Sequence, residues 1–266
     1  ASNTGQISGA CVLLERKLQK TLLHLACRHH ILEIVIGSVF RVCMGSAVTS
    51  GPEVPLFKRF QAQWKFLDRN KFDAGISDGE VAECLVDIKD NVLKFANEQL
   101  IESQPRGDYR EFIELVVIFL GAVPTTGVRF MAPGAMHHAR WLSKVLYSLK
   151  VWMFRAQFKL ARQEEKGLRD VSVFACRVYL KAWLTAPLTA CAPYNDFTLM
   201  NTLLEYKNVN PGISQASAEK LARHLWYLSE ELVGLAFFDN QVPAATKRLM
   251  VQALQEDKEP SKRVTV

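Results

Sequence analysis

Apolar residues recur at helical spacing along most of this chain, and this pattern constrains the fold more than any other feature. Residues 29–44 and 109–120 show it most clearly, each with apolar side chains at a period near 3.6 residues. Asp78 and Asp196 precede two further helical segments and are typical helix N-caps. We therefore predict a mainly α protein of about nine helices. At most two short strands are expected, one of them within residues 21–27.

Composition excludes several classes of protein. A chain of 266 residues with 49% hydrophobic residues can bury a sizeable core. The longest apolar runs, at 31–40 and 115–123, fall short of the roughly 18 residues that a membrane-spanning helix needs, so no membrane partner is expected. The six cysteines include no C-x-x-C pair, which favours a reducing compartment such as the nucleus or cytoplasm. No Walker A, dinucleotide-binding, zincin or nucleophile-elbow motif occurs.

The positive charge of the chain is concentrated in one segment. The whole sequence has 33 basic and 27 acidic residues, a net charge of +6, and residues 129–166 alone hold eight basic and two acidic ones. We predict one continuous helix over 135–166, about 45 Å long. At about 100° per residue, six of its cations share one face. They are Arg140, Lys144, Arg155, Lys159, Arg162 and Lys166. Such a stripe can follow a nucleic-acid backbone, so we interpret it as a DNA-binding surface.

Two other interpretations of the stripe stay open. Most charged helix faces are simply solvated. The stripe can also pair with an acidic face predicted within 79–100, which is made by Glu80, Glu83, Asp87, Asp90 and Glu98. An alternative function follows: an α-helical protein-interaction module with no nucleic-acid role, whose partner groove is lined by Trp152, Phe154 and Phe158.

Cysteine and histidine residues form a candidate metal site. Cys27 and His30 have C-x-x-H spacing, and His137 belongs to a distant histidine pair. These residue types ligate structural zinc, so the three residues are a candidate zinc site. The alternative is that they are core residues without metal.

The order of the motifs resembles that of the hAT-type DNA transposases and their domesticated relatives. The matching residues are Ser2-Asn3-Thr4, GACVLLE at 9–15, the Cys27-x-x-His30 motif and the pair Arg140-Trp141. The resemblance implies a ribonuclease H-like α/β fold interrupted by a long helical insertion. It also implies that Trp141 stacks on a flipped base at the cut DNA end. This chain would supply the helical insertion and the C-terminal part of that fold.

The resemblance also implies a division of the chain. We expect a remnant of the ribonuclease H-like core with the C-x-x-H motif at 1–70, a helical insertion at 71–210, C-terminal helices with the candidate catalytic glutamate at 211–258, and a polar tail at 259–266.

The catalytic carboxylates of the family are two aspartates and one glutamate. By the resemblance, both aspartates would precede Ala1, and Glu230 or Glu231 would be the glutamate, with Glu219 as an alternative. The reaction needs two metal ions held by several carboxylates, here Mg²⁺ or Mn²⁺. We therefore expect this chain alone to be catalytically incomplete. The prediction is a transposase-derived DNA-binding protein, nuclear or cytoplasmic, with self-association left open.

Overall fold

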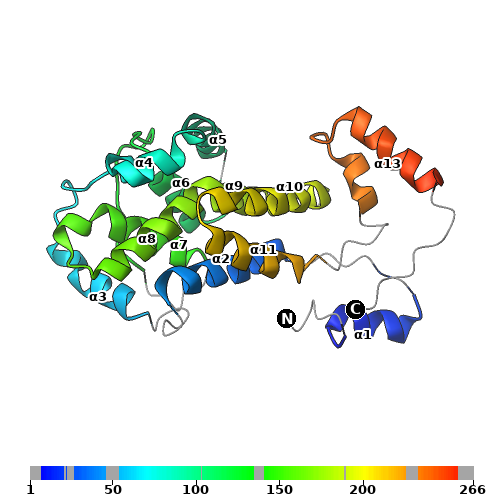
Figure 1. The fold of residues 1–266 in the computed structure, drawn as a ribbon, viewed down its shortest axis with the longest axis horizontal. Coiled ribbons are helices and arrows are strands. Elements are labelled where there is room, and N and C mark those ends of the chain that lie inside the picture. The colour runs from blue at the N-terminus through cyan, green and yellow to red at the C-terminus, as the bar shows by residue number, and fades with distance from the viewer. Residues whose placement is uncertain are drawn as a thin grey trace.

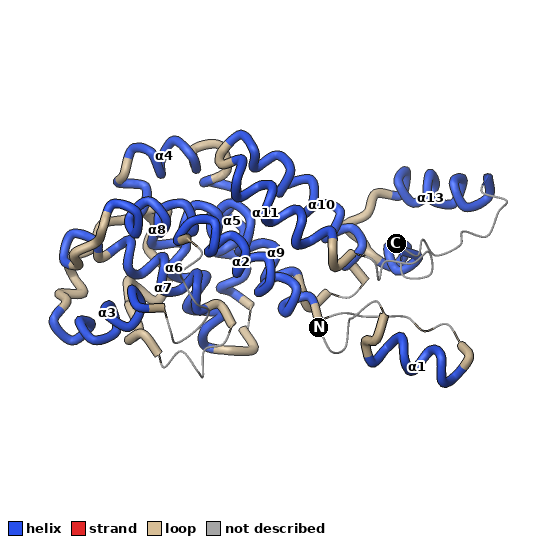
Figure 2. Tube along the Cα trace, turned by 60° about the horizontal axis from the view of Figure 1, so that its bottom comes forward, coloured by secondary structure: helices blue, strands red, loops and turns tan. Residues whose placement is uncertain are grey.

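A computed structural model describes residues 7–20, 22, 27–45, 54–102, 104–134, 141–188, 190–225 and 233–256. All regular secondary structure in these ranges is helical, which confirms the prediction of a mainly α protein (Figure 2). The strand expected within residues 21–27 lies largely outside them. None of the described helices is long and apolar enough to cross a membrane.

The helices follow one another along the chain as shown in Figure 1. They are α1 (Ala10–Leu18), α2 (Arg28–Met44), α3 (Pro55–Gln63), α4 (Gly79–Leu85), α5 (Lys89–Ile101), α6 (Gly107–Phe119), α7 (Ser143–Met153), α8 (Arg162–Phe174), α9 (Leu180–Thr185), α10 (Ala192–Glu205), α11 (Pro211–Ala222) and α13 (Ala244–Glu256). Short 3₁₀ segments include η2 (Trp64–Phe66) and η4 (Arg155–Gln157), and a π-helical segment, η5 (Ala175–Tyr179), joins α8 to α9.

The core is organised around α7, and every residue of this helix is buried. Helix α7 packs against α6 and α8, while α2 packs against α8 and α11. A helix surrounded on all sides needs apolar residues all round, and α7 supplies them except at Lys144, Lys150 and two serines. Helices α1 and α13 stand apart from this body in both views (Figures 1 and 2), and α1 has no buried residue.

The predicted continuous helix over 135–166 is wrong. Residues 135–140 lie outside the described ranges, and eight residues separate the end of α7 at Met153 from the start of α8 at Arg162. Between them the backbone becomes extended at Phe158, whose side chain is buried edge-on against Phe60 of α3. Packing of this aromatic side chain against a distant helix overrides the local helical tendency. Breaks of this kind explain why the described helices outnumber the nine predicted.

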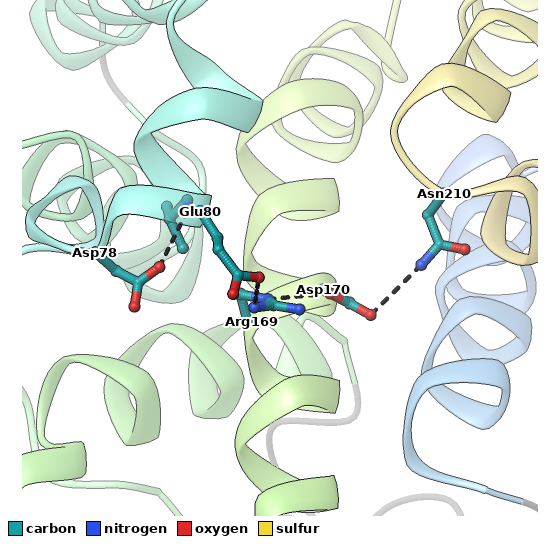
Figure 3. Close-up of polar contacts among 6 residues, drawn as sticks. Asp78, Glu80, Arg169, Asp170 and Asn210 are labelled. Carbon is teal, nitrogen blue, oxygen red and sulfur yellow. Dashed lines mark hydrogen bonds and ion pairs between the residues drawn. The ribbon is translucent and has the colours of Figure 1, made fainter.

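The two predicted N-caps have different outcomes. Asp78 caps α4, because its Oδ1 accepts a hydrogen bond of 3.1 Å from the backbone N–H of Val81 (Figure 3). Asp196 instead lies inside α10, where it is buried and forms an ion pair with Arg28 of α2. The expected cap at Asp196 is therefore wrong, and this carboxylate joins two helices in the core.

Candidate nucleic-acid interface

Lys144 lies in the protein interior and is not part of an exposed basic stripe. Lys144 is buried, and its Nζ lies 4.0 Å from Oε2 of Glu33 on α2. Oε1 of Glu33 accepts a hydrogen bond of 2.6 Å from the backbone N–H of Leu142, just before α7. Burial raises the pKa of Glu33 above its ordinary value, although Leu142, Lys144 and Tyr179 oppose the shift. The prediction that Lys144 lies on an exposed face is therefore wrong, since its partner is a carboxylate of the fold.

A second lysine of the same helix is also paired internally. Lys150 is 2% exposed, forms an ion pair with Glu111 of α6 and donates a hydrogen bond of 2.9 Å to the carbonyl of Met131. Burial lowers the pKa of Lys150 and raises that of Glu111, while their mutual attraction opposes both shifts. Lys150 is therefore one of the eight basic residues of segment 129–166, but it adds no charge to the protein surface.

Four other predicted DNA contacts follow the end of α7. Arg155 is half-buried, with its guanidinium 4.5 Å from the ring centroid of Trp152 and Nη1 3.9 Å from Oδ2 of Asp73. Lys159, Arg162 and Lys166 are exposed, and none of the three forms an ion pair with a described residue. Three unpaired cations therefore lie on the first turns of α8 and on the segment that leads into it.

A second basic segment, which the sequence analysis missed, packs against this one. Residues 55–71 hold five basic residues and one acidic residue, and residues 155–166 hold four and two. Arg59 of α3 donates hydrogen bonds of 3.1 Å to Glu164 and 3.4 Å to the carbonyl of Lys159. Gln157 exchanges two bonds of 2.9 Å with the backbone of Asp68. The two segments thus lie side by side, at one end of the helical body (Figure 1).

We call the exposed cations of these two segments the basic surface. They are Lys58, Lys65, Arg69, Lys71, Lys159, Arg162 and Lys166, together with Arg59, which is paired to Glu164. The two segments have nine basic and three acidic residues between them, a net charge of +6. The available signal was the local charge of residues 55–71, but their contact with residues 155–166 arises only from tertiary packing.

The acidic face named as a rival partner pairs with other cations. Glu80 forms an ion pair with Arg169, as Figure 3 shows, and Asp87 pairs with both terminal nitrogens of Arg177. The Arg177 hydrogen bonds lower the pKa of Asp87. Internal pairing is therefore real, but it involves cations that follow Lys166, and it leaves the basic surface without these carboxylates.

The segment of the C-x-x-H motif and the Arg-Trp motif meet at the N-terminal end of α2. The ring of His29, within the C-x-x-H motif, lies 5.4 Å from the ring of Trp141 and 4.2 Å from that of Trp183. His29 Nε2 is 3.0 Å from the carbonyl oxygen of Trp183, and burial lowers the pKa of His29. Trp141 is half-buried and Trp183 is fully buried. Trp141 and the basic surface thus lie beyond opposite ends of α7.

The apolar groove on which the interaction-module alternative depended is absent at the predicted residues. Trp152, Phe154 and Phe158 are at most 2% exposed and belong to the core. Their helical spacing indicated an apolar face correctly. That face is already covered, because Phe154 and Phe158 pack against Phe60, and Phe154 also packs against Trp64.

Four predicted site residues lie outside the described ranges. They are His137, Arg140, Glu230 and Glu231. The zinc site at Cys27, His30 and His137 and the catalytic glutamate therefore stay predictions. Within the described ranges, no three histidine, cysteine or acidic side chains are grouped so that they could hold a metal ion.

Comparisons of this chain with protein-family models, with curated proteins and with solved structures find no match. Two arrangements of residues in the structure bear on function: the basic surface, and the contact between His29 and Trp141.

Proposed function

We propose that this chain is a transposase-derived DNA-binding protein whose basic surface holds the phosphate backbone of a duplex. One observation carries the proposal. Two basic segments about a hundred residues apart in the sequence pack side by side and expose seven cations, none of which forms an ion pair with a described residue outside its own segment. Folding gathers these like charges, although gathering them opposes compaction. A polyanion that binds there relieves the repulsion.

The chemistry of the surface suits phosphate rather than base recognition. Lysine and arginine side chains neutralise phosphates and release condensed counterions, which supplies most of the sequence-independent affinity for DNA. Such contacts set the position of the protein on the duplex and carry no sequence information. The proposal therefore predicts binding that depends strongly on salt and weakly on the duplex sequence.

The transposase origin is supported by the placement of the motifs. His29, a variable position between Cys27 and His30 of the C-x-x-H motif, contacts Trp141 of the Arg-Trp motif, 112 positions away in the chain. In the proposed function Trp141 stacks on an unpaired base, and such stacking contributes about 1–3 kcal/mol per base. Glu230 or Glu231 serves as one carboxylate for Mg²⁺ or Mn²⁺ only where further carboxylates are supplied. The proposed location is nuclear or cytoplasmic.

A salt series tests the proposal. Binding of a labelled blunt duplex is measured by fluorescence anisotropy for the wild type and for the variant Lys159→Ala/Arg162→Ala/Lys166→Ala. Each lost phosphate contact should reduce the slope of log K against log salt by about 0.9, so the variant should lose up to about 2.7. Because all three residues are exposed, the free energy of unfolding should change by less than about 0.5 kcal/mol.

A matched control replaces three exposed lysines elsewhere in the described chain. Lys94 of α5, Lys181 of α9 and Lys207, which follows α10, carry the same total charge and lie outside both basic segments. The variant Lys94→Ala/Lys181→Ala/Lys207→Ala should keep most of the slope. Wild-type binding that is absent or insensitive to salt would contradict the proposal, and so would equal losses in the two variants.

A further inference from the structure

A pocket of about 560 Å³ opens directly beside the basic surface. It lies between α8, the C-terminal end of α2 and the N-terminal end of α11. Its lining includes Arg162 and Lys166 from the basic surface, with Cys43, Asp170 and Asn210. A smaller pocket of about 330 Å³ adjoins it and shares Lys166, Asp170 and Asn210. Pockets of this size are typical of sites for small organic ligands.

A close helix crossing fixes the shape of the pocket. A Cβ on Gly167 of α8 would lie 2.7 Å from the carbonyl oxygen of Cys43 and would also overlap the sulfur of Met44. Only glycine permits α8 and the end of α2 to approach so closely. This approach brings two residues of α8 to the edge of α2. One is Lys166, which precedes Gly167, and the other is Asp170, one turn further along the helix.

The pocket combines two unpaired cations with one partly satisfied carboxylate. Arg162 and Lys166 are one helical turn apart and form no ion pair with a described residue, so both are available to one anionic group. Asp170 is half-buried, and burial raises its pKa, although Arg169 and Lys166 oppose the shift.

The neighbours of Asp170 hold it but leave it room for a donor. Asn210 donates a hydrogen bond to Oδ2 of Asp170, and Arg169 donates one to Oδ1 (Figure 3). Each of the two bonds is 3.4 Å long. The Oδ1 of Asn210 is used to cap α11 by accepting from the N–H of Ile213 at 3.1 Å. A carboxylate has about four acceptor positions, so Asp170 keeps acceptor capacity. The pocket therefore presents an acceptor one helical turn beyond a cationic pair on the same face of α8.

We propose that this pocket binds one unpaired nucleotide, with its phosphate on Arg162 and Lys166 and the exocyclic amine of its base on the carboxylate of Asp170. A carboxylate accepts a hydrogen bond from the amine of cytosine, whereas thymine presents a carbonyl oxygen at the same position and is repelled. The pocket prefers cytosine over thymine for this reason. The inference rests on the proposed function, because the nucleotide continues from DNA held on the basic surface.

The test compares two pyrimidines of nearly equal shape. Affinities are measured for one duplex with a short single-stranded end of either dC or dT, and calorimetry measures the mononucleotides dCMP and dTMP. The wild type should bind the dC forms about fivefold more tightly or better. In Asp170→Asn the side chain keeps its shape but loses its charge and gains a donor, so the preference should fall below about twofold.

Glu165→Gln is the matched control. It makes the same change of charge on the same helix, and Glu165 lines neither pocket. This variant should keep the wild-type preference, and unfolding curves should show that both variants fold. Equal affinity of the wild type for dC and dT would overturn the inference, as would a preference that survives Asp170→Asn. The proposed function fails separately, if the blunt duplex does not bind. The preference of the pocket for cytosine is measured independently of duplex binding, with dCMP and dTMP.

Discussion

The lysines inside α7 and the cations that follow this helix differ only in their surroundings. All belong to the segment 129–166, which carries a net charge equal to that of the whole chain. Lys144 and Lys150 are buried, and each faces a carboxylate from another helix, Glu33 of α2 or Glu111 of α6. Lys159, Arg162 and Lys166 are exposed, and no carboxylate in the described ranges forms an ion pair with them. A cation of the first kind belongs to the fold, and one of the second kind is available to a ligand.

The difference arises from the faces of the two helices. Helix α7 is enclosed on all sides, so a lysine there packs its alkyl chain in the core, and its ammonium group needs a partner. Helix α8 begins in solvent and buries only its later residues, from Gly167 onward. Its first turn can therefore carry charge without a partner in the protein.

The largest expected effect comes from breaking the buried pair. Glu111→Ala leaves the ammonium of Lys150 in the core without a carboxylate, with the Met131 carbonyl and the ring of Trp64 as its described neighbours, and this should lower the free energy of unfolding by about 3–5 kcal/mol. Urea unfolding followed by circular dichroism measures the change. The double variant Glu111→Leu/Lys150→Met removes both charges and should recover most of the loss. If Glu111→Ala were as stable as the wild type, the buried lysines of α7 would not depend on their carboxylate partners, and the distinction from the exposed cations would be wrong.

A smaller effect is expected at the exposed pair between Asp87 and Arg177. The pKa of Asp87 is lowered, so the pair stabilises the folded state above the unfolded pKa, near 3.8, and this contribution is lost as pH falls through the folded pKa. Because Asp87 is more than half exposed, Asp87→Asn should cost only about 0.2–1 kcal/mol at neutral pH. Unfolding of both proteins from pH 7 to pH 2 should show the difference closing. A difference that is constant with pH would mean that the ion pair is not its source.

The sequence was sufficient for those features that depend on neighbouring residues. Apolar spacing predicted the helical character, and Asp78 was recognised as a cap because its acceptor role involves only the next three residues. Asp196 has the same local appearance, but its partner is Arg28, 168 positions away. The break after Met153 likewise depends on Phe158 meeting Phe60. Such contacts exist only after folding, so neither could be inferred from local patterns.

The same limit applied to the candidate site. The sequence identified Lys159, Arg162 and Lys166 from local charge, and all three are exposed. It could not separate them from Lys144, which has the same helical phase but lies in the core. It also gave no reason to join residues 55–71 to them, because this contact is made by Arg59 and Gln157 across about a hundred residues.

The most direct test of the central claim uses the half of the basic surface that the sequence did not indicate. The variant Lys58→Ala/Lys65→Ala/Arg69→Ala removes one exposed cation from α3, one from η2 and one from the turn after η2, while Arg59 and its ion pair with Glu164 remain. If residues 55–71 and 155–166 form one DNA-binding surface, the salt dependence of duplex binding should weaken, with a slope reduced by up to about 2.7, as in the α8 variant. A slope equal to that of the wild type, in a variant that folds normally, would contradict the account.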